Sequence, residues 1–134
     1  MTVFVDTSAI FAFLAANDVD HDRAAATLAD LRQNEELVTH NYVVVETAAL
    51  VHSRLGPEAA RDLLRVFLPS LNVSWVDERL HEAATSGYLA ARRRDISLVD
   101  WVSFEFMHRS GLTDAFAFDR DFAEQGFALI PLAR

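Results

Sequence analysis

The chain has 134 residues, 51% of them hydrophobic, and a net charge of −8, which indicates a folded globular protein of one domain rather than a disordered one. It contains no cysteine and no lysine, so disulfides, zinc–thiolate sites, cysteine nucleophiles, P-loop chemistry and Schiff-base chemistry are all excluded. The negative charge argues against broad electrostatic binding to a polyanion, so a nucleic-acid role would have to depend on bound metal and local arginines.

The first half of the chain alternates short β-rich runs with helical stretches, which predicts an α/β fold with a parallel sheet. The Gly56-Pro57 pair predicts the end of one helix and the start of the next. In chain order we expect a strand over residues 3–5, helices over 7–16 and 20–33, a strand over 37–39 and a helix over 41–54.

The second half continues the same alternation. Ser97 has the residue type and position of a helix N-cap. We expect a helix over residues 57–68, a strand over 73–76, helices over 77–94 and from Ser97 to about residue 110, and strands over 115–118 and 127–130. No repeat, linker or low-complexity segment divides the chain, so we expect residues 1–134 to form a single domain.

Four acidic residues each close or interrupt an apolar run that should form part of the core: Asp6, Glu46, Asp100 and Asp119. A buried carboxylate without a partner is expensive to ionise, and four that converge need cations between them. Asp6 and Asp119 follow apolar strands, and the carboxyl ends of neighbouring parallel strands meet at one edge of a sheet. The pattern therefore predicts a divalent-metal site.

Each acid also has an ordinary structural explanation. Asp6 and Asp119 suit the N-cap position of a helix, where aspartate is strongly preferred. Asp100 fits the first turn of a capped helix. Glu46 either faces solvent along a narrow stripe with Thr47 and Arg54 or points at a positive charge. These explanations stay open from the residues alone.

The segments VDTSAIFAFL, SLVDWVSF and FDRDF, together with the helix that holds Glu46, resemble the PIN-domain family and more closely its compact bacterial toxin branch, the VapC-type ribonucleases. The resemblance covers essentially the full length. It implies a Rossmann-like three-layer α/β fold, with a five-stranded parallel sheet of order 3-2-1-4-5 and an acidic site at its carboxyl edge. It also implies that Asp6, Glu46, Asp100 and Asp119 are catalytic and bind Mg²⁺ or Mn²⁺.

Residues next to these acids match supporting positions of the family. Thr7 and Ser8 would orient carboxylates or a ligating water. Ala117 stands where the family usually has Thr or Ser, so one supporting hydroxyl is missing. Asp121 could share or substitute for the role of Asp119.

Several arginines are candidates for holding RNA phosphates. Arg120 lies beside a proposed metal ligand, and Arg92, Arg93 and Arg94 form a basic triplet. For the triplet, favourable charge at the C-terminus of a helix is at least as good an explanation. The histidines do not have metal-ligand spacing, and we expect them on the surface or in the core.

The resemblance implies a metal-dependent endoribonuclease, the toxin of a toxin–antitoxin pair, which hydrolyses phosphodiester bonds in structured RNA such as tRNA or rRNA. Two alternatives stay open. One is a housekeeping nuclease of the same fold that processes RNA or DNA. The other is a catalytically weakened PIN domain that binds protein or RNA, for which Ala117 is the support.

The apolar helices expected over residues 7–16 and 98–108 predict an interface in addition to a core, so we expect a homodimer. By resemblance, a cognate antitoxin segment would lie over the apolar helices and insert a basic side chain among the acids. No apolar stretch reaches the roughly 18 residues of a membrane span, and the N-terminal segment lacks signal-peptide features. We therefore expect a cytoplasmic protein without a membrane partner.

Overall fold

The strand β1 (Thr2–Val5) is the centre of a five-stranded sheet in this computed structural model, which describes residues 1–132. All neighbouring strands run parallel, in the order β3-β2-β1-β4-β5, as the resemblance implies. The remaining strands are β2 (Glu36–His40), β3 (Asn72–Ser74), β4 (Asp114–Phe116) and β5 (Ala128–Ile130).

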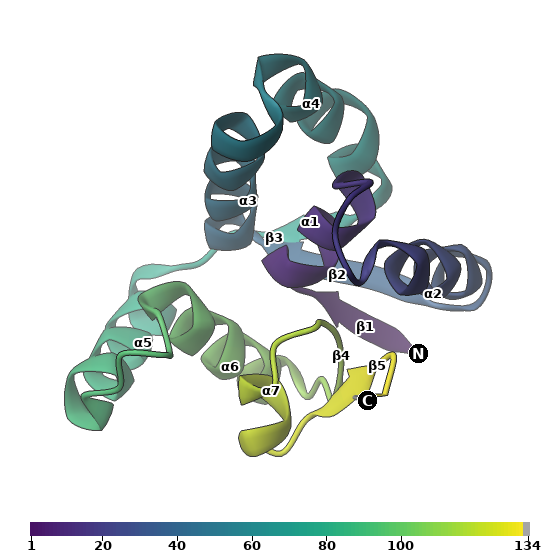
Figure 1. Cartoon of the computed structure of the whole chain (residues 1–134). Helices are drawn as coiled ribbons and strands as arrows, with labels where there is room; N and C mark the ends of the chain where they lie inside the picture. The colour runs from purple at the N-terminus through teal and green to yellow at the C-terminus, as the bar shows by residue number, and fades with distance from the viewer. Residues whose placement is uncertain (133–134) are drawn as a thin grey trace.

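Helices cover both faces of this sheet, so the fold has three layers (Figure 1). The helices α1 and α2 lie on one side of the strands, while α6 lies on the other side and packs against α5. The α-helices are α1 (Thr7–Leu14), α2 (His21–Asn34), α3 (Asn41–Leu55), α4 (Pro57–Asp62), α5 (Glu78–Ala91), α6 (Leu98–Ser110) and α7 (Asp121–Glu124). In the part of the chain described, no helix is long and apolar enough to span a membrane.

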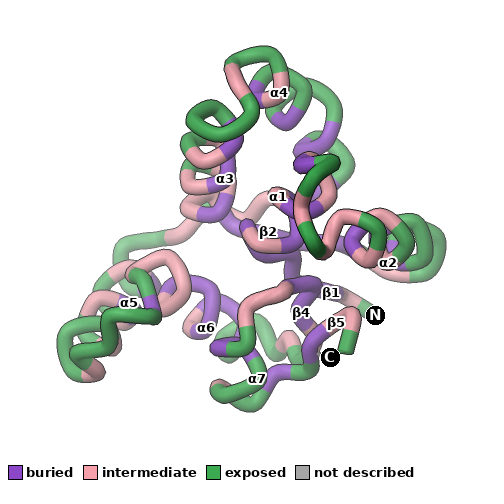
Figure 2. The backbone as a smooth tube through the Cα atoms, viewed as in Figure 1, coloured by how far each residue is buried: buried purple, intermediate pink, exposed green. Residues whose placement is uncertain are grey.

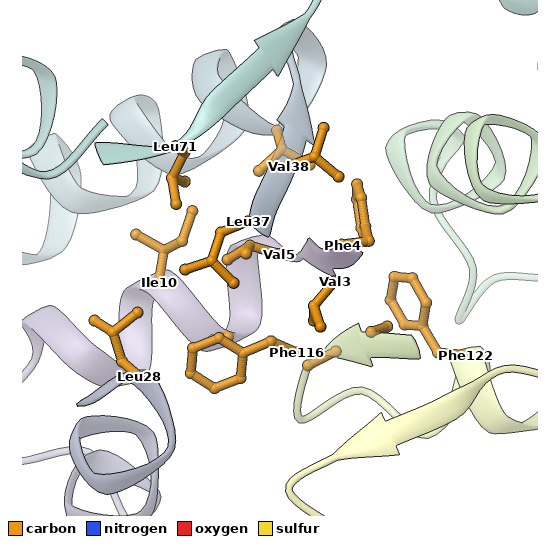
Figure 3. Packing of buried hydrophobic residues seen from close by; sticks show 14 of the residues in the cluster. Val3, Phe4, Val5, Ile10, Leu28, Leu37, Val38, Leu71, Phe116 and Phe122 are labelled. Carbon is orange, nitrogen blue, oxygen red and sulfur yellow. The ribbon is translucent and has the colours of Figure 1, made fainter. Parts of the chain in front are cut away.

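The core lies on both faces of β1, because successive side chains of a strand point to opposite faces. Phe4 packs against Phe106 and Phe122 on the α6 side, with ring centroids 5.8 and 5.9 Å away. On the α1 and α2 side, Ile10 and Leu28 fill the space over the sheet (Figure 3). The strands at the centre of the sheet are accordingly buried over most of their length, except at their first residues (Figure 2).

The apolar helix α6 is largely explained by this core. Val102, Phe104, Phe106 and Met107 are all buried within the chain. The apolar character of α6 is therefore not itself evidence for an interface, although it contributed to the homodimer prediction.

The helix predicted over residues 57–68 is shorter than expected. After α4, residues Leu63–Phe67 form a π-helical turn and Leu68–Ser70 a 3₁₀ turn. Pro69 explains the change, because proline has no N–H to donate and its ring clashes with the carbonyl oxygen four residues earlier.

Other boundaries also differ from the predictions. The helix expected to reach residue 94 ends at Ala91, because Arg92 adopts the left-handed conformation, with φ 51° and ψ 40°. The strand expected over 115–118 ends at Phe116, so Asp119 lies in a loop and does not follow the strand directly. The short helix α7 had no predicted bounds.

Close packing of α5 on α6 depends on Gly87. A Cβ atom at this position would lie 3.1 Å from Cε3 of Trp101, closer than ordinary van der Waals contact. The missing side chain lets the helix that precedes the arginine triplet lie directly against the helix that carries Asp100.

Candidate active site

The carboxyl ends of β1 and β4 bring two of the predicted ligands together. Val5 pairs with Phe116 across the strands, and the backbone N–H of Asp6 donates to the carbonyl oxygen of Phe116 at 3.0 Å. Asp6 is the N-cap of α1 and is only 4% exposed. The capping explanation for Asp6 is therefore correct, and its carboxylate is also buried at the edge of the sheet where Asp119 arrives.

Ser8 fixes the Asp6 carboxylate. Its backbone N–H and its hydroxyl donate to Oδ2 of Asp6 at 3.1 and 2.6 Å. The same hydroxyl accepts the N–H of Phe118 at 3.0 Å, one residue before Asp119. Ser8 thus joins the start of α1 to the loop after β4, close to the position where Ala117 lacks a hydroxyl.

Thr7 has a different contact from its neighbour. Its Oγ1 accepts a hydrogen bond from Oγ1 of Thr47 at 3.0 Å, and both side chains are buried. The bond ties the start of α1 to α3, the helix that carries Glu46. Thr7 contacts no acid of the site through its side chain in the described structure, so it supports the helices rather than a carboxylate.

Asp100 belongs to a capping box at the start of α6. Oδ2 of Asp100 accepts the N–H of Ser97 at 2.9 Å, and the N–H of Asp100 donates to the hydroxyl of Ser97 at 3.2 Å. The predicted capping role is confirmed. It occupies one carboxylate oxygen and leaves the other available, so capping and metal binding are compatible here.

The predicted N-cap role of Asp119 is wrong, because the N-cap of α7 is Arg120, but one oxygen of Asp119 is also held by a backbone N–H. Its Oδ1 accepts the backbone N–H of Asp121 at 2.9 Å. Asp6, Asp100 and Asp119 therefore each have one oxygen held by a nearby backbone N–H. Among residues 1–132, the second oxygen of each forms no hydrogen bond. These carboxylates are held in place with one ligand atom free.

The tightest acidic cluster consists of Asp100, Asp119 and Asp121, whose carboxylates can place one oxygen each within 4.8 Å of one another. Asp6 and Glu46 lie outside this group of three but are close enough to repel its charges. The carboxylate of Asp6 interacts with those of Asp100 and Asp119, and the carboxylate of Glu46 interacts with that of Asp100. Asp121, which was expected to support Asp119 or to share its role, is one of the three. The DxD spacing of FDRDF was the sequence signal for it.

The acids carry strongly raised pKa values. Burial, with added repulsion from Asp100 and Asp119, raises the pKa of Asp6 to about 7 even though Ser8 stabilises its charge. Burial and the charge of Asp119 raise the pKa of Asp100 and that of Asp121 to about 6. Three carboxyl groups that resist ionisation beside one another indicate a site arranged for positive charge.

No side chain supplies that charge. Within the described residues, no arginine, histidine or N-terminus forms an ion pair with Asp6, Glu46, Asp100, Asp119 or Asp121. Hard carboxylate oxygens are the ligands that Mg²⁺ and Mn²⁺ prefer. The donor set therefore fits the divalent cation that the sequence predicts.

Glu46 lies at the rim of the site on α3. Its half-buried side chain lines an open groove of about 480 Å³ together with Tyr42, Val45 and Val99. Arg120 is exposed beside Asp119 and lines a smaller cavity of about 180 Å³ with Arg23 and Phe118. The groove is mostly apolar, which the sequence did not indicate.

Comparison with known proteins gives a consistent picture. The family model described as PIN domain matches residues 3–128. The chain is 34% identical over 126 residues to the 23S rRNA-specific endonuclease VapC20 of Mycobacterium tuberculosis, covering 93% of this chain and 95% of that protein.

Solved structures agree at the level of the fold. The crystal structure of M. tuberculosis VapC20, a sarcin–ricin loop cleaving toxin, superposes with a TM-score of 0.84 and covers 94% of this chain and 96% of its own. VapBC2 from Rickettsia felis, bound to a DNA fragment from its promoter, superposes with a TM-score of 0.72 at 14% identity, covering 96% and 97%. At that identity the second likeness concerns the fold alone.

Proposed function

The chain belongs to the PIN-domain family, and from this premise we propose that it is a metal-dependent endoribonuclease, the toxin of a toxin–antitoxin pair. The observation that carries the proposal is the set of carboxylates at the ends of β1 and β4. Each of Asp6, Asp100 and Asp119 is fixed through one oxygen, and their repulsion is not offset by any described side chain.

In the proposed mechanism, Asp100, Asp119 and Asp121 would hold the cation, with Asp6 and Glu46 adding negative charge beside them. When bound, Mg²⁺ or Mn²⁺ supplies a water that ionises near neutral pH and offsets charge on the phosphate. Ser8 keeps Oδ2 of Asp6 in place so that its other oxygen stays turned to the site.

The protonation of the carboxylates also matters for the proposed reaction. In the metal-free protein the pKa of Asp6 is about 7 and that of Asp100 and Asp121 about 6, so these groups are partly protonated near neutral pH and would release protons when a cation binds. We propose that a carboxylate of the site that does not ligate the cation accepts the proton from the attacking water. Arg120, exposed next to Asp119, is placed to bind a phosphate of the substrate.

Structured RNA is the proposed substrate, with 23S rRNA at the sarcin–ricin loop as the first candidate, because that is the target of the relative at 34% identity. The proposed partners are a cognate antitoxin and a second copy of the chain. We further propose a cytoplasmic protein in which residues 1–134 form one domain; residues 133 and 134 lie outside the described structure.

The alternative of a weakened binding module rests on Ala117. In this structure the hydroxyl of Ser8 already bonds both Asp6 and the backbone before Asp119. The loss of a hydroxyl at position 117 therefore does not leave these loops unconnected, and we favour a competent nuclease.

Cleavage of purified ribosomes and total RNA tests the proposal. We expect discrete fragments with Mg²⁺ or Mn²⁺, none with EDTA, and a loss of at least about 100-fold in rate for Asp100→Asn, because one charged ligand is removed. Asp30→Asn, which changes an exposed carboxylate of α2, is the matched control and should cut normally. Wild type and Asp100→Asn that are folded, free of antitoxin and equally inactive would contradict the nuclease.

A further inference from the structure

The arginine triplet lies outside the helix that was expected to contain it. Since α5 ends at Ala91, Arg92 is its C-cap, and the next two arginines belong to the loop before α6. Arg92, Arg93 and Arg94 line an open cavity of about 620 Å³ together with Tyr88 and Leu89. This surface, residues 88, 89 and 92–94, is called the arginine surface below.

Only one of the three arginines is neutralised. Arg93 donates through Nε and Nη2 to the two oxygens of Asp95, at 3.0 and 2.5 Å, and its Nη1 lies 3.5 Å from Glu124. In the described structure no carboxylate lies within ion-pair distance of Arg92 or Arg94, and both are exposed. Two uncompensated positive charges thus stand together on a protein whose net charge is −8.

The contacts of Arg93 place the arginine surface next to the acidic centre. Glu124 belongs to α7, the short helix that begins at Asp121. Both Asp95 and Glu124 are near enough to Asp121 to help raise its pKa. The arginine surface is therefore linked to the acidic cluster through Asp95 and Glu124, both of which Arg93 contacts.

The backbone conformation of Arg92 is unusual for a residue with a side chain. A left-handed C-cap favours glycine or asparagine, and a residue with a Cβ there is strained. Helix C-terminal charge does not explain Arg94, which lies beyond the last turn of α5.

We propose that the arginine surface is the docking site for the RNA strand that enters the acidic centre, an inference that rests on the proposed function. The guanidinium groups of Arg92 and Arg94 bind consecutive phosphates, for which their fork of N–H donors is suited. The ring of Tyr88, 42% exposed at the same cavity, stacks on a nucleobase. The surface supplies the positive potential that the rest of this acidic protein lacks.

Binding of a synthetic RNA hairpin with the sarcin–ricin loop sequence, followed by fluorescence anisotropy in EDTA, tests the surface without cleavage. The double variant Arg92→Gln/Arg94→Gln should bind on the order of tenfold more weakly in dilute salt, and the slope of log K against log salt should fall by about 1.4 to 1.8. Arg61→Gln/Arg65→Gln, which removes two exposed arginines elsewhere, is the matched control and should leave both quantities unchanged.

Tyr88→Leu separates stacking from charge. It should weaken binding about fivefold or more with no change in the salt slope. In Mg²⁺, the arginine double variant should raise KM with little change in kcat.

The outcomes separate the two proposals. Equal affinities and slopes for the two arginine double variants would overturn the docking site, even where wild type cleaves RNA normally. A wild type that binds the hairpin through Arg92 and Arg94 but cuts no RNA would support the surface and contradict the nuclease.

Discussion

The hydroxyl of Ser8 connects two loops whose bonded residues are 110 positions apart in the chain. It donates to Asp6 and accepts from the backbone N–H of Phe118, so it adds a side-chain link between Asp6 and Asp119 to the backbone hydrogen bond from Asp6 to Phe116. Position 117 is alanine, so no hydroxyl there can form a second link of this kind, and within residues 1–132 Ser8 alone supplies it. At the scale of single residues, the geometry of the site depends on the hydrogen bonds that orient each carboxylate.

Ser8→Ala should lower the affinity for Mn²⁺ by about 10- to 100-fold, because a carboxylate loses the bond that orients it. Isothermal titration calorimetry measures this directly. Ser53→Ala, at an exposed position of α3, is the matched control and should bind Mn²⁺ like wild type. Equal affinities for Ser8→Ala and Ser53→Ala would show that Ser8 does not position Asp6.

Asp100→Asn should stabilise the protein in EDTA. The folded-state pKa of Asp100 is raised to about 6 from an ordinary value of 3.8, so its ionisation costs stability, and that cost appears as the pH rises through this range. At about pH 8 we expect the variant to be more stable by about 1–2 kcal/mol, after a discount for partial exposure. Asparagine can still accept the N–H of Ser97, so the cap is kept.

Urea unfolding with EDTA and with Mg²⁺ measures this effect. Mg²⁺ should stabilise wild type and leave Asp100→Asn nearly unchanged, because a ligand adds stability only to a state that binds it. A variant less stable than wild type in EDTA would mean that Asp100 is mainly a structural residue of α6.

At the scale of elements, the buried residue His40 joins the two helices that carry Glu46 and Asp100. Its Nδ1 accepts the N–H of Val43 at 3.3 Å and so caps α3. Its Nε2 must then carry the proton, which it donates to the hydroxyl of Ser103 in α6 at 2.9 Å. The expectation that the histidines are surface or core residues holds for His40, whose ring also stacks on Phe4.

His40 should make the protein sensitive to acid. Burial lowers its pKa to about 3 from 6.5, so between these pH values His40 binds a proton in the unfolded chain but stays neutral in the folded protein. Stability from this residue is present above pH 6.5 and is lost as the pH falls toward 3, by about 1.4 kcal/mol per pH unit.

The difference between wild type and His40→Gln isolates this effect, because the other titrating groups cancel. Unfolding free energies measured in EDTA from neutral to mildly acidic pH should converge as the pH falls. Parallel curves would contradict a neutral, buried His40 as the source of acid sensitivity.

Much of the element order was predictable, because strands and helices differ in the period of their apolar residues. The segment VFV and the capped helix after Ser97 were assigned correctly. The π-helical turn at Leu63–Phe67 and the end of α5 at Arg92 were not, since a π turn and a left-handed arginine are set by tertiary packing rather than by local propensity. Arginine is an ordinary helix residue by sequence, which concealed the boundary.

The candidate site was predictable in membership but not in geometry. Acidic residues that follow apolar runs identify Asp6, Asp100 and Asp119, since burying them is costly. That Asp121 lies in the tightest cluster while Glu46 lies at the rim depends on the loop after β4 and on the position of α3. No local pattern encodes these distances.

At the scale of the whole molecule, charge is divided between an acidic centre and the neighbouring arginine surface, in a protein whose net charge is −8. Exposed apolar side chains add a third feature. They include Val45 on α3, Trp75 after β3 and Leu89 on α5, each at least 66% exposed. Contiguous apolar patches mark places where partners bind, and these side chains are the candidates to belong to one.

The protein should therefore be a homodimer in solution. Light scattering coupled to size exclusion, at micromolar concentration and without antitoxin, measures the mass. Twice the chain mass of 15.0 kDa supports the dimer, and the mass of one chain would contradict it. Trp75→Ser is an informative variant, because loss of this exposed ring should weaken the dimer if it lies at the interface.

The central claim is that the carboxylates at the ends of β1 and β4 hold a divalent cation. The most direct measurement is the anomalous scattering of a crystal of the protein grown with Mn²⁺. We predict a peak within bonding distance of Asp100, Asp119 and Asp121, beside Asp6, and absent from crystals of Asp100→Asn grown in the same way. A crystal that contains Mn²⁺ only at other sites, with these carboxylates unligated, would contradict the account.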